Sequence, residues 1–76
     1  MLEITVRYFA HLREKRGLSE ETIRLPVSCT VAELYQQIFS SDCTGIRFAI
    51  DATYVDADTM VVDGAEIAFL PPMGGG

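Results

Sequence analysis

Histidine, cysteine and tryptophan are scarce in this chain, which contains one, two and none of them. Structural metal sites are usually built from four ligands at short, regular spacings, and His11, Cys29 and Cys43 are too few and too scattered to form one. The sequence also offers no nucleophile–base pair of the kind that covalent catalysis needs. We therefore expect no metal site, no active site formed by this chain alone, and an exposed helix position for His11.

The two cysteines flank a segment that we interpret below as a helix. A rise of about 1.5 Å per residue places their Cα atoms about 15 Å or more apart. Because a disulfide needs Cα atoms within about 7 Å, the sequence predicts that Cys29 and Cys43 are free thiols.

Basic residues are also few, at six against eleven acidic ones, and the formal net charge is −5. Apart from the short run of Arg13, Lys15 and Arg16 they form no stripe, so nucleic-acid binding is disfavoured. An acidic surface suits docking on a basic protein face, although a solvated acidic surface without that role is at least as common.

Long apolar runs are absent, and no segment approaches the length of a membrane span. The first five residues lack the basic, apolar and small-residue order of a secretion signal, so we expect a cytoplasmic protein. Seventy-six residues allow one domain, and a domain of this size buries only about 60% of its unfolded surface. A deep active-site cleft is therefore not expected.

The first third of the chain alternates between strand and helix patterns. Residues 2–8 alternate apolar and polar with period two, which predicts a strand with one buried face. Residues 10–16 contain good helix formers and stop at Gly17, a suitable left-handed cap. Residues 22–25 predict a second strand paired to the first, and Pro26 indicates an edge strand or a strand end.

The rest of the chain predicts one longer helix and more strands. Thr30 and Glu33 have the spacing of a capping box, which marks the start of a helix. Apolar residues at helical spacing then predict a stripe that packs on the sheet, and these are Val31, Leu34, Tyr35, Ile38 and Phe39. Strands are predicted at residues 47–50, 54–55 and 66–70, with a turn at Asp63-Gly64 before the last.

This order of elements predicts an α+β, two-layer fold. A right-handed crossover through the long helix brings a late strand beside the first one in parallel, so the sheet is mixed and packs on one main helix. The arrangement is that of a β-grasp, ubiquitin-like domain. We expect the domain to span residues 1–72 and a flexible glycine tail to span residues 73–76.

The carboxyl terminus is the most distinctive segment, because Met73, Gly74, Gly75 and Gly76 follow two prolines directly. Glycine has no Cβ, so this thread can enter a channel too narrow for other residues. At about 3.3–3.6 Å per residue it can carry the terminal carboxylate about 14 Å beyond the prolines. The pattern predicts that the carboxylate is the reactive group; the alternative is an ordinary frayed tail.

Four segments of the sequence resemble the family of molybdopterin synthase small subunits, which are ubiquitin-like sulfur carriers. The segments are Val6 to Glu14, Thr30 to Leu34, Tyr54-Val55, and Asp63 to Pro72 before the glycine end. The resemblance implies that an E1-like enzyme uses ATP to adenylate the carboxylate of Gly76, and that sulfur then replaces one oxygen. The resulting thiocarboxylate donates sulfur to cyclic pyranopterin monophosphate inside the large synthase subunit.

On this resemblance the chain is not an enzyme by itself and binds no cofactor alone. ATP belongs to the activating enzyme, and sulfur is carried as the thiocarboxylate of Gly76, with Gly75 beside it. The implied partners are the activating enzyme and the large subunit, assembled as two small and two large subunits, with no nucleic acid and no membrane.

Docking on the large subunit needs an apolar patch on the sheet face opposite the main helix. Alternation predicts Phe9 and Leu70 there, with Tyr54 beside them. We expect the partner to contact these three residues and the exit of the thread, which comprises Pro71, Pro72, Met73 and Gly74. The alternative is that three outward hydrophobic residues are normal on any surface.

Three other functions stay open at the level of the sequence. A sulfur carrier of the thiamine pathway has the same terminus, although such relatives usually lack the long segment between the first two strands, here Phe9 to Glu20. A ubiquitin-like modifier forms an isopeptide bond with target lysines through Gly76. A plain interaction module carries an incidental tail.

Overall fold

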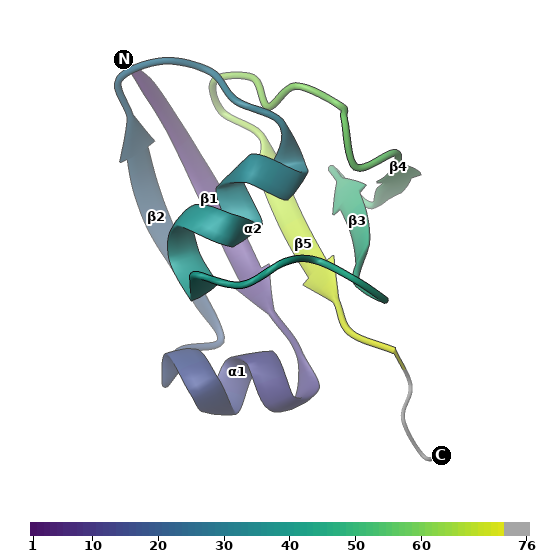
Figure 1. Ribbon diagram of the computed structural model, residues 1–76. Helices are drawn as coiled ribbons and strands as arrows, with labels where there is room; N and C mark the ends of the chain where they lie inside the picture. The colour runs from purple at the N-terminus through teal and green to yellow at the C-terminus, as the bar shows by residue number, and fades with distance from the viewer. Residues whose placement is uncertain (73–76) are drawn as a thin grey trace.

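A computed structural model describes residues 1–72 of the chain, so Met73, Gly74, Gly75 and Gly76 lie outside the described residues. One five-stranded sheet carries helix α2 across one face, and the short helix α1 lies at one end (Figure 1). The elements are β1 (Leu2–Tyr8), α1 (Ala10–Arg16), β2 (Glu20–Leu25), α2 (Val31–Phe39), β3 (Arg47–Ile50), β4 (Thr53–Val55) and β5 (Glu66–Leu70).

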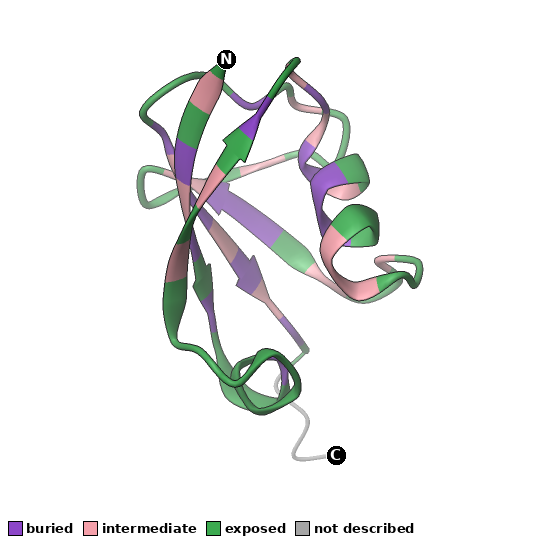
Figure 2. Cartoon of the chain, turned by 90° about the vertical axis from the view of Figure 1, so that its left-hand side faces the viewer, coloured by how far each residue is buried: buried purple, intermediate pink, exposed green. Residues whose placement is uncertain are grey.

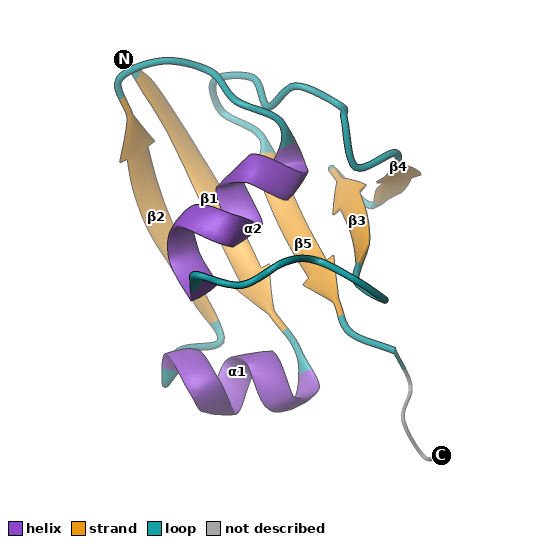
Figure 3. Cartoon of the chain, in the orientation of Figure 1, coloured by secondary structure: helices purple, strands orange, loops and turns teal. Residues whose placement is uncertain are grey.

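The strands follow the order β2-β1-β5-β3-β4 across the sheet. Strands β1 and β5 are parallel, whereas every other neighbouring pair is antiparallel. The predicted mixed sheet and β-grasp arrangement are therefore confirmed, and β2, the strand that precedes Pro26, lies at an edge (Figure 3). Because β5 lies in the middle of the sheet, the chain leaves the domain directly from its most enclosed strand.

The core lies between the sheet and α2, as the distribution of buried residues shows (Figure 2). At its centre the ring of Phe69 lies 5.2 Å from that of Tyr35 and 5.7 Å from that of Phe48, both edge to face. Aromatic pairs in such geometry contribute about 0.5–1.5 kcal/mol each beyond the burial of area. The inward side chains of β5 are therefore packed in the core, whereas its outward side chains lie on the opposite face of the sheet and are only partly buried.

Helix α2 begins at the predicted capping box. The Thr30 hydroxyl accepts a hydrogen bond from the backbone N–H of Glu33 at 3.1 Å, and the Glu33 carboxylate accepts one from the N–H of Thr30 at 2.9 Å. The stripe that follows packs on the sheet, with Val31, Leu34 and Tyr35 buried. The helix ends at Ser40, which adopts a left-handed conformation.

Some details differ from the expectations. Strand β2 begins at Glu20 rather than Thr22, because Glu20 and Glu21 pair with Arg7 and Val6 on β1. Strand β4 begins at Thr53 rather than Tyr54, because Thr53 pairs with Ile50 on β3. The bounds of β1, α1, β3 and β5 are as predicted. Cys29 and Cys43 are free thiols and His11 is exposed, as expected.

Residues 1–72 contain neither a candidate membrane span nor a candidate metal site. No helix in this range is long and apolar enough to cross a membrane. In the same range no three histidine, cysteine, aspartate or glutamate side chains are grouped so that they could hold a metal ion.

Candidate functional site: a docking face beside the carboxyl terminus

The sheet face away from α2 brings the predicted contact residues together. Across the central strands Leu70 of β5 pairs with Arg47 of β3, and Ala49 of β3 pairs with both Ala68 of β5 and Tyr54 of β4. Side chains that are directly opposite on neighbouring strands share one face of a sheet. Leu70 and Tyr54 therefore lie on the same side, opposite the buried Phe69 and Phe48.

A tight turn between β3 and β4 positions Tyr54. Asp51 and Ala52 both have positive φ, at 49° and 69°, which fits a two-residue hairpin turn whose twist matches the strands. The turn is fastened to β5, because the Asp51 N–H donates to the carbonyl of Glu66 at 2.9 Å and the Glu66 N–H donates to Asp51 Oδ1 at 3.0 Å. The hairpin thus holds Tyr54 at a fixed place beside β5.

Phe9 reaches the same face from the junction between β1 and α1. Its backbone is extended, and its carbonyl accepts a hydrogen bond from the N–H of Leu12 at 3.0 Å, so it is the residue that opens α1. Ala10 follows with a positive φ of 51°, a conformation that costs an L-residue on the order of 1 kcal/mol. This sharp bend leaves the Phe9 side chain 38% exposed instead of directing it into the core.

Two hollows on this face share the three predicted side chains. The first has a volume of about 590 Å³, and we call it the exit groove; its lining includes Phe9, Gly45, Arg47, Tyr54, Leu70 and Pro72. The second has a volume of about 260 Å³ and extends the surface toward Arg7, Ala68 and Glu66. Phe9, Tyr54 and Leu70 line both hollows. The structure therefore gathers the three predicted residues into one patch, which we call the docking face.

The two prolines differ in their surroundings. Both prolines line the exit groove, but Pro71 is buried whereas Pro72 is exposed. A Cβ added at Gly45 would lie 3.7 Å from Cγ of Pro72, so the loop before β3 lies against the start of the thread. Pro72 is therefore the more accessible of the two prolines, and the partner contacts predicted for both stay predictions. The predicted roles of Met73, Gly74, Gly75 and Gly76 concern residues outside the described part.

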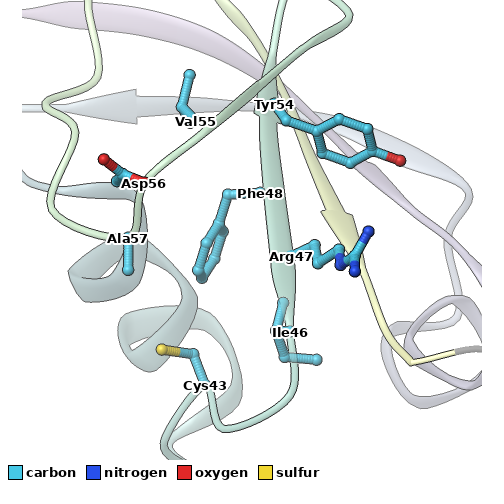
Figure 4. A pocket seen from close by; sticks show the side chains of 8 residues that line it. All are labelled: Cys43, Ile46, Arg47, Phe48, Tyr54, Val55, Asp56 and Ala57. Atoms are coloured by element: carbon cyan, nitrogen blue, oxygen red, sulfur yellow. The ribbon is translucent and has the colours of Figure 1, made fainter.

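A third hollow, of about 520 Å³, lies along β3 and β4 (Figure 4). Figure 4 shows that Arg47 and Tyr54 project to one side of β3, whereas Phe48 and Asp56 lie on the other. The Arg47 guanidinium carbon is 5.9 Å from the centre of the Tyr54 ring, within the range of a cation–π contact. Arg47 was not predicted as a contact residue from the sequence. Strand alternation could have identified it, because Arg47 faces outward and pairs directly with Leu70.

One polar cluster stands apart from the docking face. Glu21 of β2 accepts hydrogen bonds from the Tyr8 hydroxyl and from Arg16 Nε, the latter at 2.6 Å. The bonds from Arg16 hold the pKa of the Glu21 carboxyl below its usual value, while burial, followed by the bond to Glu21, raises the pKa of Tyr8. The cluster ties the end of α1 to β2 and is structural.

The buried cysteine is not a reactive thiol. Burial raises the pKa of Cys29, and the nearby carboxylate of Glu33 raises it further. Since the thiolate is the nucleophilic form, this shift disfavours reaction at Cys29. Sulfur chemistry on this chain is therefore not expected at Cys29.

The model of the ThiS family matches residues 6–76, which is nearly the whole sequence. The chain belongs to the ThiS family. Among the proteins similar to this chain are the molybdopterin synthase sulfur carrier subunits of Chlamydomonas reinhardtii and Homo sapiens. The algal protein is 33% identical, over 99% of this chain and 100% of the relative. The human protein is 32% identical, over 100% of this chain and 97% of the relative.

Solved structures agree with the fold of this ThiS-family chain. A candidate molybdopterin converting factor subunit 1 from Pyrococcus furiosus is 28% identical and superposes with a TM-score of 0.78, covering 96% of this chain and 100% of that one. Small archaeal modifier protein 1 from Haloferax volcanii superposes with a TM-score of 0.80 over the same shares of the two chains, but at 15% identity it shows the fold alone. The family resemblance drawn from the sequence is thereby confirmed.

Proposed function

We propose that this chain is the sulfur carrier subunit of a molybdopterin synthase, acting in the cytoplasm. The observation that carries the proposal is its similarity, at 33% identity over the full length of both chains, to a protein of that name. The geometry supports it, because a docking face with three large apolar side chains lies next to the point where a glycine thread leaves the domain. A carrier needs both features, one for holding a partner and one for reaching into it.

The proposed chemistry starts with the carboxylate of Gly76, which is anionic and a poor electrophile. An E1-like enzyme joins it to the AMP portion of ATP and releases pyrophosphate, so the terminal carbonyl carbon acquires a good leaving group. Sulfide-level sulfur from a donor, as hydrosulfide, then attacks that carbon, AMP departs with the bonding electrons, and loss of the proton on sulfur leaves a thiocarboxylate. Gly74 and Gly75 carry no side chains, so the thread can pass through a narrow channel to the activating site.

The second stage takes place in the large subunit, which we propose as the docking partner. The thiocarboxylate sulfur attacks an electrophilic carbon of cyclic pyranopterin monophosphate, and an oxygen substituent of that carbon leaves with the bonding electrons and takes up a proton. Water then cleaves the acyl–sulfur bond, leaving sulfur on the product and a carboxylate on Gly76. Two such transfers supply the two sulfurs of the dithiolene. This chain positions the sulfur atom for transfer. Phe9, Tyr54 and Leu70 hold the domain on the large subunit, and tethering of the thiocarboxylate to the domain makes the transfer an effectively unimolecular step.

The test is to locate sulfur on the chain. The protein is incubated with the activating enzyme, ATP and a sulfur source, then cleaved after Arg47, its last basic residue, to release residues 48–76. Replacing oxygen by sulfur changes the mass almost as much as oxidising Met60 or Met73, so fragment ions must assign the change to Gly76. We expect a thiocarboxylate there only when ATP is present. An unmodified terminus under these conditions would rule out the carrier function.

Two alternatives call for additional measurements. A ubiquitin-like modifier would give isopeptide bonds between Gly76 and lysines of other proteins, which appear as conjugates of higher mass. A thiamine-pathway carrier would also form the thiocarboxylate but would transfer its sulfur to a different acceptor enzyme. Binding to the large synthase subunit distinguishes this last case.

A further inference from the structure

We infer that Arg47 is a specificity-determining residue of the docking face, which pairs with a carboxylate on the large synthase subunit. The inference rests on the proposed function and adds to it the chemistry of the partner surface. That surface should present an apolar side chain to the exit groove and, beside it, an aspartate or glutamate to Arg47.

The first argument is that the charge of Arg47 is not compensated inside the described part of the chain. Three arginines lie on the outer face of the sheet. Arg24 pairs with Glu3 at 3.2 Å, and Arg7 lies 3.8 Å from both Glu20 and Glu66. Within residues 1–72 no carboxylate oxygen lies within 4.0 Å of the guanidinium of Arg47. Asp56, which borders the same strand pair, lies on the other side of β3 (Figure 4).

The second argument is the position of Arg47 in an otherwise acidic region. From residue 26 to the end of the chain it is the only basic residue, and every other charged residue there is acidic. It nevertheless pairs directly with Leu70 and lines the exit groove together with Phe9 and Tyr54. The chain has a net charge of −5, so one positive charge in the exit groove stands out from its surroundings. It favours the one orientation in which a negative charge of the partner lies beside Arg47.

The geometry of the side chain suits a carboxylate. The guanidinium carbon of Arg47 lies 5.9 Å from the centre of the Tyr54 ring. This cation–π contact limits the motion of the guanidinium and leaves its N–H groups available to a partner. Two N–H groups of a guanidinium can bind both oxygens of one carboxylate. Because the side chain is already restricted, less conformational entropy is lost when this ion pair forms. Apolar neighbours such as Phe9 and Leu70 exclude water once a partner docks, and this strengthens the pairing.

The reach of the thread decides between a protein carboxylate and the phosphate of the adenylate. Arg47 lines the groove at Pro72, whereas four extended residues after Pro72 span about 14 Å. When the thread enters a partner's active site, the reacting group is therefore far from Arg47. The guanidinium faces the surface of the partner instead of the nucleotide.

The test compares binding of four proteins to the large synthase subunit from the same organism, by calorimetry and stopped-flow at about 0.05 M and about 0.5 M NaCl. They are the wild type, Arg47→Leu, Arg47→Glu and, as a control with the same charge change as the leucine variant, Arg24→Leu. We expect Arg47→Leu to weaken binding about five- to tenfold at low salt and Arg47→Glu to weaken it further, mainly through slower association. The differences should shrink at high salt, and Arg24→Leu should bind within about twofold of the wild type.

Each outcome decides between the two claims. If the wild type binds but both Arg47 variants bind equally well at both salt concentrations, the inference is wrong and the proposed function stands. The same holds if Arg24→Leu loses as much affinity as Arg47→Leu, because the effect is then one of net charge. If the wild type does not bind the large subunit at all, the proposed function and the inference both fall. Unchanged unfolding transitions for all four proteins show that the differences come from the interface.

Discussion

Leu70 is the residue on which the docking face is centred. It pairs with Arg47 across the sheet, lines both hollows on that face, and is the last residue of β5 before the prolines. Its side chain is only partly buried, so an aspartate there remains solvated in the free domain. In a complex, the same carboxylate would be buried among apolar groups, which costs several kcal/mol.

We therefore expect Leu70→Asp to weaken binding to the large subunit by about a hundredfold or more, with little change in the free energy of unfolding. Titration calorimetry and thermal unfolding measure the two quantities. Val27→Asp is the matched control, because Val27 is 70% exposed and lines none of the three hollows. Equal affinities for the two variants would show that the docking face has been misassigned.

Glu21 makes the stability of the domain depend on pH. Its folded pKa lies below the usual value, chiefly because of Arg16, so the unfolded chain takes up a proton at higher pH than the folded one. The stabilisation is therefore fully present above the ordinary glutamate pKa of about 4.3, and it is lost as the pH falls through the lower folded pKa.

Glu21→Gln should reduce the free energy of unfolding by about 1 kcal/mol at pH 7. Urea unfolding across pH 3 to 7 should show this difference shrinking as the pH falls (roughly the range in which glutamates titrate). Glu20→Gln is the control, because the Glu20 carboxylate is exposed and its distance of 3.8 Å from Arg7 is too long for a hydrogen bond. This substitution should change the free energy of unfolding much less. A loss for Glu21→Gln that stays constant with pH would contradict the assignment.

At the scale of elements, the stability of α2 depends on its N-terminal capping box. The cap fixes the residue at which the helix starts, and the start determines which side chains of α2 face the sheet. Thr30→Ala removes the hydroxyl that accepts from Glu33 N–H, and we expect it to lower the free energy of unfolding by about 1 kcal/mol. Thr30→Ser keeps the hydroxyl and should lose only a small part of this. Urea unfolding of both variants measures the contrast, and equal losses would mean that the cap contributes nothing.

The strands and helices were largely predictable, because their signals are local. The alternation of β1 and β5, the capping box of α2 and the glycine after α1 each specify an element within a few residues. The start of β2 was missed, since Glu20 has low strand propensity and is recruited only by pairing with Arg7 on β1.

The docking face was predictable in part. Alternation predicted Phe9 and Leu70 on this face, with Tyr54 beside them. Strand pairing places Leu70 and Tyr54 there, whereas Phe9 follows the end of β1 and is positioned by the start of α1. Arg47 was overlooked because its significance depends on which arginines find carboxylates, and this is a property of tertiary contacts. The burial of Pro71 likewise depends on how the chain leaves the central strand, which no local pattern specifies.

At the scale of the whole molecule, we propose separate roles for the domain and for the glycine thread. The body, residues 1–72, presents a rigid face on a sheet whose middle strand runs directly to the exit. The chemistry is assigned to the carboxylate at Gly76, with catalytic groups supplied by partners. Stability and transfer should therefore respond to different substitutions.

The most direct measurement follows a labelled sulfur atom through one turnover. The chain is prepared with an isotopically labelled thiocarboxylate at Gly76 and mixed with the large subunit and cyclic pyranopterin monophosphate, and mass spectrometry follows the label. The account predicts that the label moves into the pterin product, that two carriers are consumed per product, and that Gly76 returns to a carboxylate. A carrier shortened by one glycine and labelled at Gly75 should unfold like the full chain but fail to transfer. Label that stays on the full-length chain while the two proteins are bound would contradict the account.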